Sequence, residues 1–331
     1  MSSRQMTTRR GRGLRLVAVA LAGLAAASAA GAQTYPARPV RLLVGFPPGG
    51  GADMIARQLS PRLSQELGQS FVVDNHPGAN GRIGADMTAK APPDGYTLLV
   101  STEGALVIGP HIAQKPSYDA LQDFTPVTLL SRTAVILAAN PSLPVRSLGD
   151  LLALAKAKPG SLFYGSSGFG GPNHLAGEVF KKQAGVEIEH VAYKGTGAVI
   201  PALLSGQVQL MFGFVPGLAP FVKSGDMTAL GVGSSKRSAA LPEVPTIDEA
   251  GVPGYDMTSW IGVLAPARTP PEIVRRLRDT MAAILLTPEI RDGLIRDGLE
   301  PIASTPEEFA AFLHREDAKY AGLLAGLDIK E

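Results

Sequence analysis

The stretch that decides the fold reads VGFPPGGGADMIARQL at residues 44–59. Before it, PVRLLVGF (39–46) is apolar and typical of a buried strand, and after it Ile55 and Leu59 recur at helical spacing. A glycine-rich loop that opens a helix leaves main-chain N–H groups uncovered, and the aligned peptide dipoles add partial positive charge there. The loop is therefore a candidate receptor for a negative group. The alternative is a tight turn in which Asp53 serves only as a helix cap or as an acid in the first helical turn.

A second loop has the same character. In YGSSGFGGPNHLAGE (164–178), Ser166 and Ser167 add hydroxyl donors to the amides of a glycine-rich loop that again opens a helix. Both loops follow strands, and open α/β sheets bind ligands beyond the carboxyl ends of their strands. Two such loops suit a molecule that carries carboxylates. His174, one turn into the helix, either caps the loop or contacts the ligand.

Strand-like and helix-like runs alternate along the chain, which predicts an α/β fold. SFVVDN (70–75) is strand-like, and SLGDLLALAKAKPG (147–160) is helix-like with Ser147 as its predicted N-cap. The β-prone run at 123–140 is long enough to pass from one domain into another. The order of the elements predicts two lobes, with the middle third of the chain inserted between an N-terminal lobe and its C-terminal completion.

The first residues of the chain are predicted to be a cleavable signal peptide. Four arginines precede the apolar run LRLVAVALAGLAAASAA (14–30), and small residues follow it. The alternative is a membrane anchor, but the run is short for a span. Removing residues 1–32 takes away five of the 31 basic residues and none of the 29 acidic ones, so the formal charge falls from +2 to −3. We therefore expect a periplasmic protein without the basic field that nucleic acid requires.

The sequence contains few of the motifs that enzymes use for catalysis. It contains no cysteine, no P-loop string and no pair of histidines at metal-binding spacing, so we expect no metal and no cofactor. The nucleophile-elbow pattern G-x-S-x-G fails because Phe169 stands where the last glycine belongs. One catalytic alternative stays open, a hydrolase that uses Ser166 or Ser167 with His174. Lys194, after a strand, is either a surface lysine or a charged partner of the ligand.

Six motifs together resemble the substrate-binding proteins of tripartite tricarboxylate transporters, also called Bug proteins, and they cover essentially the whole chain after the predicted signal. They are YPARPVRLLVGFPPGGGAD (35–53), APPDGYTLLV (91–100), SLGDLLALAKAKPG (147–160), HLAGEVFKKQAGVEIEHVAYKGTG (174–197), SSKRSAALPEVPTIDEAGVPG (234–254) and TPEEFAAF (305–312). The resemblance implies a two-lobed fold of the type II periplasmic-binding-protein class, with the ligand cleft between the lobes. It implies a receptor that captures a small molecule, usually a carboxylate, and no enzymatic activity.

The resemblance also implies which residues contact the ligand, except for Pro48, His174 and Phe214, which are candidates from this chain's own sequence. The predicted ligand-binding residues are Pro48, Gly49, Gly50, Gly51, Ala52, Asp53, Thr102, Ser166, Ser167, Gly168, His174, Lys194, Gly195 and Phe214. The chain departs from the family where Gly213 and Phe214 replace a polar pair. Either Phe214 offers an aromatic face to a bulkier or aromatic ligand, or it packs under the loop. Glu103 is a second departure, which would repel an anion or accept from an amine or hydroxyl of the ligand.

The predicted organisation is a signal peptide at 1–32, a first lobe at 33–133 plus 236–331, and a second lobe at 134–235. The hinge is expected in two crossings near residues 131–136 and 230–238. Closure over a small-molecule carboxylate would then be read by a tripartite tricarboxylate-type membrane permease or by a sensor kinase. We expect the receptor to act as a monomer.

Overall fold

The computed structural model describes residues 35–327 and Ile329. It divides the chain into two units, and the second, residues 38–331, holds every helix and strand described below. The predicted signal peptide at 1–32 lies outside the described residues. None of the helices within 35–327 combines the length and the apolar character that crossing a membrane requires.

The strands of this unit are joined in the order β2-β1-β3-β9-β4-β7-β5-β6, with β8 and β10 also paired to β4. Their bounds are β1 (Val40–Val44), β2 (Phe71–Asn75), β3 (Thr97–Ser101), β4 (Phe124–Ala139), β5 (Phe163–Ser166), β6 (Glu189–Ala192), β7 (Leu210–Phe214), β8 (Thr228–Val232), β9 (Thr258–Pro266) and β10 (Glu300–Pro301). β1 runs parallel to β2 and β3, and β5 runs parallel to β6 and β7. These parallel pairs are linked through helices, as the alternating sequence predicts.

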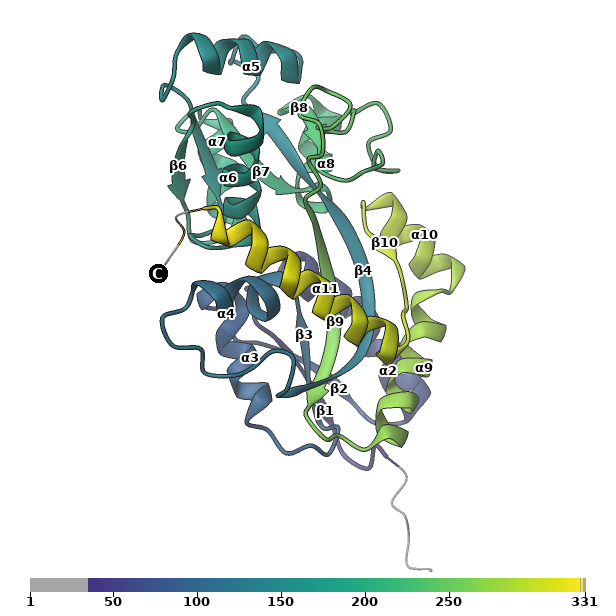
Figure 1. Ribbon diagram of the computed structural model, residues 1–331. Coiled ribbons are helices and arrows are strands. Elements are labelled where there is room, and N and C mark those ends of the chain that lie inside the picture. The colour runs from purple at the N-terminus through teal and green to yellow at the C-terminus, as the bar shows by residue number, and fades with distance from the viewer. Residues whose placement is uncertain (1–34, 328, 330–331) are drawn as a thin grey trace, which may run out of the picture. The chain divides into compact units, whose positions relative to one another are not determined.

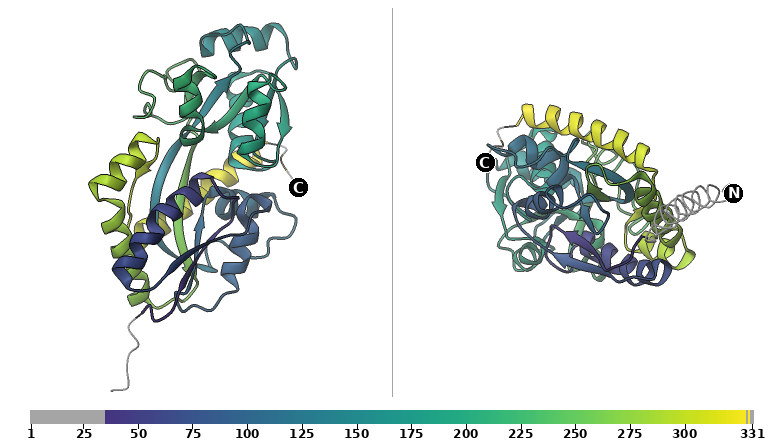
Figure 2. Two further views of the ribbon diagram at one scale, coloured as in Figure 1. Left: turned by 180° about the vertical axis from the view of Figure 1, so that it is seen from behind. Right: turned by 90° about the horizontal axis from the view of Figure 1, so that it is seen from below.

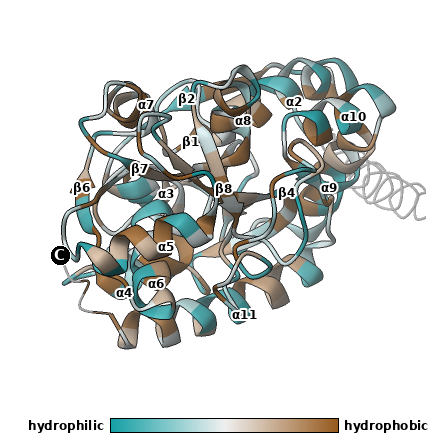
Figure 3. Cartoon of the chain, turned by 90° about the horizontal axis from the view of Figure 1, so that it is seen from above, coloured by the Kyte–Doolittle hydropathy of each residue, from teal (hydrophilic) through white to brown (hydrophobic). Residues whose placement is uncertain are grey.

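The helices cover the faces of the sheets. They are α2 (Gly51–Leu67), α3 (Arg82–Ala89), α4 (Gly109–Ile112), α5 (Leu148–Ala157), α6 (Pro172–Ala184), α7 (Thr196–Leu204), α8 (Val215–Ser224), α9 (Pro271–Leu285), α10 (Pro288–Arg296) and α11 (Pro306–Ala325), with short helical turns at Ala79–Gly81 and Gly104–Ile108. Seen from above, α11 alternates between apolar and polar residues, as expected of a helix with one buried face (Figure 3). The N-cap predicted at Ser147 is confirmed, because Ser147 forms a capping box with Asp150.

The long strand β4 belongs to both lobes of the fold (Figure 1). From Phe124 to Ala134 it pairs with β9, and from Val135 to Ala139 it pairs with β7 and β8 instead. The first lobe is built on β1, β2, β3, β9 and the first part of β4, and the second lobe on the rest of β4 with β5 to β8. This change of partner falls within the first predicted crossing. The residue limits of the lobes stay a prediction.

Packing ties the two lobes together. One buried apolar cluster includes Leu43 and Leu99 from the first lobe and Tyr164 and Phe180 from the second. α11 lies across β4 and β9 and ends beside α6, where Lys182 Nζ donates to the carbonyl oxygen of residue 326 at 3.1 Å (Figure 1). On the opposite side of the first lobe, α2 packs beside α9 (Figure 2). The lobes are therefore parts of one packed body.

Candidate ligand-binding site

Loops that follow four different strands meet around Asn80 and Gly81. The ring of Phe46, after β1, lies against Gly81, where an added Cβ would be 3.1 Å from the Phe46 Cζ. A Cβ on Gly104, after β3, would be 3.1 Å from the carbonyl oxygen of Asn80. The side-chain Nδ2 of Asn80 donates to the carbonyl oxygen of Phe169, after β5, at 2.9 Å. The two predicted binding loops are thus connected through the loop that carries Asn80, at the carboxyl ends of the strands.

The first loop presents uncovered main-chain donors. Residues 48–51 are exposed, whereas Ala52 is buried. The amides of residues 50–52 donate to no acceptor in the part of the chain that the structure describes, since the first helical bond of α2 is from Met54 to Gly50. A helix N-terminus with unpaired amides attracts a negative group. This loop can therefore accept an anion without rearrangement.

Asp53 braces the first loop from behind. Its carboxylate accepts the amide of Gly49 at 2.9 Å, the Nε of Arg57 at 2.9 and 3.0 Å, and the Nδ2 of Asn75 at 2.9 Å. Burial works to raise the pKa of Asp53, but the hydrogen bonds from Arg57, Gly49 and Asn75 outweigh it and hold the pKa below its usual value. In this structure both oxygens of Asp53 serve the loop, which matches the reading of Asp53 as a first-turn acid.

The second loop is largely satisfied by its own groups. The Ser166 hydroxyl donates to the carbonyl oxygen of Gly168 at 3.1 Å and accepts the amide of Gly168 at 3.3 Å. The Ser167 hydroxyl donates to Asn173 Oδ1 at 3.1 Å, and the amide of Gly170 donates to His174 Nδ1 at 3.0 Å. The expected donation of both hydroxyls to a ligand would require these bonds to exchange. The amides of the first loop are therefore more available to a ligand than the donors of the second loop.

Two histidines stack behind the second loop. The rings of His174 and His190 lie 3.9 Å apart and nearly parallel, and the ring of Phe169 lies 4.9 Å from that of His174, tilted by 36°. Burial lowers the pKa of each histidine to about 4, so both are neutral at pH 7. His174 caps the loop by accepting the Gly170 amide, and its contact with the ligand stays a prediction. The sequence reading missed His190, whose Nε2 lies 2.6 Å from the Ser166 hydroxyl oxygen.

The hydrolase alternative assigned the wrong residues. Ser166 is fully buried, and its imidazole partner is His190 instead of His174. His174 uses Nδ1 to accept the Gly170 amide, and Ser167 bonds to Asn173. A nucleophile must reach both its base and its substrate. Neither serine does so with His174.

The other predicted contacts lie at the ends of neighbouring strands. The Thr102 hydroxyl accepts the amide of Gly104 at 3.3 Å, and Lys194 is exposed between β6 and α7. Gly195 is the N-cap residue of α7 and has a φ of 89°, a conformation that favours glycine. Phe214 is half-buried at the end of β7 and packs on the core cluster. Each of these contacts with ligand stays a prediction.

Glu103 does not face a ligand. Its side chain is fully buried, and Oε2 accepts the amide of Trp260 at 3.2 Å. The expectation that Glu103 repels an anion or accepts from a ligand is therefore wrong for this conformation, because the carboxyl group points toward β9. The adjacent Thr102 would carry any ligand contact at this strand end.

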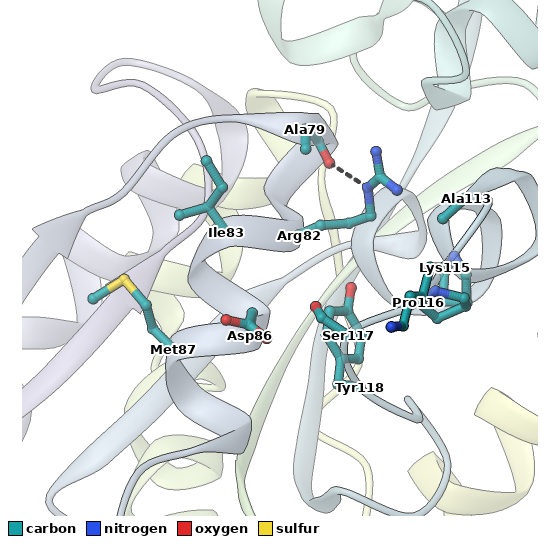
Figure 4. A pocket seen from close by; sticks show the side chains of 11 residues that line it. Ala79, Arg82, Ile83, Asp86, Met87, Ala113, Lys115, Pro116, Ser117 and Tyr118 are labelled. Atoms are coloured by element: carbon teal, nitrogen blue, oxygen red, sulfur yellow. Dashed lines mark hydrogen bonds between the residues drawn. The ribbon is translucent and has the colours of Figure 1, made fainter. Parts of the chain in front are cut away.

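A cavity of about 290 Å³ opens on the first lobe, between α3 and the segment at 110–118 (Figure 4). Arg82, Asp86 and Tyr118 are among its lining residues, and none of the predicted ligand-binding residues is. Within the described residues, no three histidine or acidic side chains gather in a group that could hold a metal ion. The cavity borders the convergent loops, because Ala79 and Arg82 line it on either side of Asn80 and Gly81, but it does not include the predicted binding residues.

Comparison with known proteins identifies the family. Residues 55–328 match the model of the tripartite tricarboxylate transporter family receptor. The chain belongs to this family. Protein BugT from Bordetella pertussis is 37% identical over 307 residues, which are 92% of this chain and 94% of BugT. The chain is a solute-binding receptor, and members of its family are binding proteins and not enzymes.

Solved structures agree with this assignment. Rpa4515 from R. palustris, solved with adipate, is 40% identical with a TM-score of 0.84, covering 87% of this receptor and 97% of that chain. MatC from Rhodopseudomonas palustris, solved with bound malate, is 30% identical with a TM-score of 0.81, covering 87% of this receptor and 99% of that chain. The receptor has the two-lobed fold of periplasmic binding proteins, as the sequence predicts.

Proposed function

We propose that this receptor binds a small molecule with at least one carboxylate between its two lobes. The observation that carries the proposal is the row of amides at residues 50–52, which donate to nothing in the described part of the chain and open the helix α2. The adipate and malate bound by two neighbours have the same chemistry. The predicted cationic contact Lys194 would add to the attraction.

Magnitudes favour a site that uses several contacts at once. A micromolar dissociation constant corresponds to about −8 kcal/mol. Hydrogen bonds to a charged group contribute roughly 1.5–3 kcal/mol each, whereas association costs an estimated 4–15 kcal/mol. Three amides in the first loop therefore need help from the second lobe. Closure supplies this help, because it adds contacts and excludes water from the bonds already formed.

The exposed ring of Phe169 and the half-buried ring of Phe214 add apolar surface to the ends of β5 and β7. We infer that the ligand carries an apolar or aromatic part beside its carboxylate. The receptor would work in the periplasm after export and deliver the ligand to a tripartite tricarboxylate-type permease or report it to a sensor kinase. We propose that it acts as a monomer.

The test replaces Gly50 by aspartate. Gly50 is the N-cap of α2 with a φ of −77°, and a Cβ there meets only the carbonyl oxygen of Pro47, at 3.7 Å, so the backbone accepts a side chain. An N-cap aspartate offers its own carboxylate to the amides, and changes helix stability by only a few tenths of a kcal/mol relative to glycine. Calorimetric titration with adipate, malate, benzoate and the neutral adipamide would be run on both proteins.

We expect at least one acid to bind the wild type, adipamide to bind far more weakly, and Gly50→Asp to lose acid binding while keeping its melting temperature. Gly50→Ala is the matched control, because it adds a Cβ without a charge. Equal binding of acid by Gly50→Asp and Gly50→Ala would rule out the amides as the anion receptor. Binding of adipamide as tightly as adipate would rule out a carboxylate ligand.

A further inference from the structure

Asn80 connects the two lobes by a direct contact that needs no ligand. It lies in the turn Ala79–Gly81, which follows β2 in the first lobe. Its Nδ2 donates to the carbonyl oxygen of Phe169, which follows β5 in the second lobe, at 2.9 Å. The two partners are 89 positions apart in the sequence. Separation of the lobes must therefore break this bond.

The carboxamide of Asn80 fits into a socket made by glycines of both lobes. A Cβ on Gly171 would lie 3.0 Å from Asn80 Oδ1, and one on Gly168 would lie 3.5 Å from it. From the first lobe, a Cβ on Gly104 would lie 3.6 Å from the Asn80 Cβ. A side chain on Gly171 would crowd the carboxamide, whereas a Cβ on Gly168 or Gly104 would lie at ordinary contact distance from the Asn80 side chain. The missing side chain of Gly171 therefore makes room for Asn80.

The backbone around Asn80 adopts a conformation that side chains rarely accept. Ala79 and Asn80 have φ values of 48° and 54°, between Gly78 at 141° and Gly81 at 93°. Asparagine tolerates the left-handed region better than most residues, but two consecutive residues with side chains there are unfavourable. Such a conformation persists only where the surroundings hold it, and it marks candidate functional positions. Here the turn projects Asn80 toward the second lobe.

We propose that Asn80 is the closing latch of this receptor, a residue that stabilises the closed arrangement and so raises the affinity for every ligand by the same factor. The inference rests on the proposed function, in which closure accompanies binding. An interaction present in the closed state and absent from the open one shifts the equilibrium between them by its full strength. A single neutral hydrogen bond shifts such an equilibrium about 2- to 12-fold.

The first experiment needs no ligand. Amide hydrogen exchange would be measured by mass spectrometry on the wild type and on Asn80→Ala, following the segment 166–171 in the opposite lobe. The exchange rate follows the population of the open form even when that population is small. We expect exchange at 166–171 to become about 2- to 12-fold faster in Asn80→Ala. The exposed amide Gln122, in the first lobe, provides the control Gln122→Ala, which should exchange like the wild type.

The second variant disturbs the latch from the other side. Gly171 has a φ of −82°, so alanine fits the backbone there, yet its Cβ would press on Asn80 Oδ1. We expect Gly171→Ala to speed exchange at 79–82, in the first lobe. In the double variant Asn80→Ala/Gly171→Ala, exchange at 79–82 should be no faster than in Asn80→Ala alone. The alanine at position 80 is too short to meet the methyl group added at position 171. The latch would be overturned if either single variant exchanged in the opposite lobe at the same rate as the wild type. It would also be overturned if the increases in exchange rate of the two single variants added up in the double variant.

Titration with adipate and malate separates the latch from the proposed function. If the wild type binds them, Asn80→Ala should weaken both by one common factor, which is the ratio of the closed fractions of the two proteins without ligand. Unequal factors would show that Asn80 touches the ligand, which contradicts the latch. If the wild type binds neither acid, that result counts against these ligands alone, and the exchange measurements still decide the role of Asn80.

Discussion

Replacing Glu103 by glutamine should stabilise the receptor at neutral and alkaline pH. Glu103 is fully buried, and its Oε1 has no hydrogen-bond partner in the described part of the chain. Burial raises the pKa of Glu103 to about 7, although bonds from Ser259 and from the Trp260 amide oppose the rise. The nearby carboxylate of Glu316 adds to it. Ionised Glu103 is therefore a buried charge without adequate compensation.

The size of the effect follows from the two pKa values. The carboxyl group titrates near 4.5 when exposed and near 7 in the fold, and each unit of difference is worth about 1.4 kcal/mol. The folded chain keeps the proton between these values and the unfolded chain loses it. The free energy of unfolding thus falls as the pH rises from 4.5 to 7, by about 3 kcal/mol. Glutamine has the shape of the protonated acid and does not titrate.

Urea unfolding at pH 4.5, 6 and 8 measures this directly. The free energies of unfolding of Glu103→Gln and the wild type should differ little at pH 4.5. At pH 8 the free energy of unfolding of the variant should exceed that of the wild type by about 3 kcal/mol. The exposed Glu187 provides the control variant Glu187→Gln, whose difference from the wild type should stay near zero. A gain for Glu103→Gln that is the same at all three pH values, or a loss at pH 8, would refute the reasoning.

Three further changes test other parts of the structure. Lys194→Gln should weaken acid binding several-fold at low salt and less at 0.5 M salt, since Lys194 is exposed and its charge is screened; salt-independent weakening would argue against a charge effect. For His174, whose pKa is lowered to about 4 by burial, the unfolded chain takes the proton first, so lowering the pH from 6.5 to 4 should cost the wild type about 3 kcal/mol more than His174→Phe. Parallel unfolding profiles of the two proteins would disprove this. Gly262→Ala should lower stability by about 1–3 kcal/mol, because its Cβ would fall into the ring of Phe309, and an unchanged melting temperature would contradict that packing.

Local patterns in the sequence predicted most of the fold. Ser147 was recognised as a cap because a serine directly before a helix-like run is a local signal, and the structure shows the cap. The helix Val215–Ser224 was missed because Pro216 and Pro220 disguise it as a loop, although Pro216 stands in its first turn, where proline is tolerated. The helical segment after β3 was missed as well. These two segments are helical because of how they pack in the folded protein, and no local sequence pattern indicates that packing.

The site shows the same division between local and distant signals. The two glycine-rich loops were found because each is one continuous stretch. The bond from His190 to Ser166 depends on the parallel register of β5 and β6, which places His190 opposite Tyr164. Asn80 reaches Phe169 only through a left-handed turn and the meeting of two lobes. Neither relation leaves a trace in residue spacing.

The order in which the strands of the first lobe are synthesised affects the export of the chain and its binding by chaperones before it folds. β3 takes β1 as one neighbour and β9 as the other, and β9 begins only at Thr258. During synthesis the N-terminal third therefore carries an unfilled sheet edge until three quarters of the chain has been made. For a protein exported as we propose, that delay would keep the nascent chain unfolded, as passage through a translocation channel requires. It would also leave an unpaired strand edge that a chaperone would have to cover.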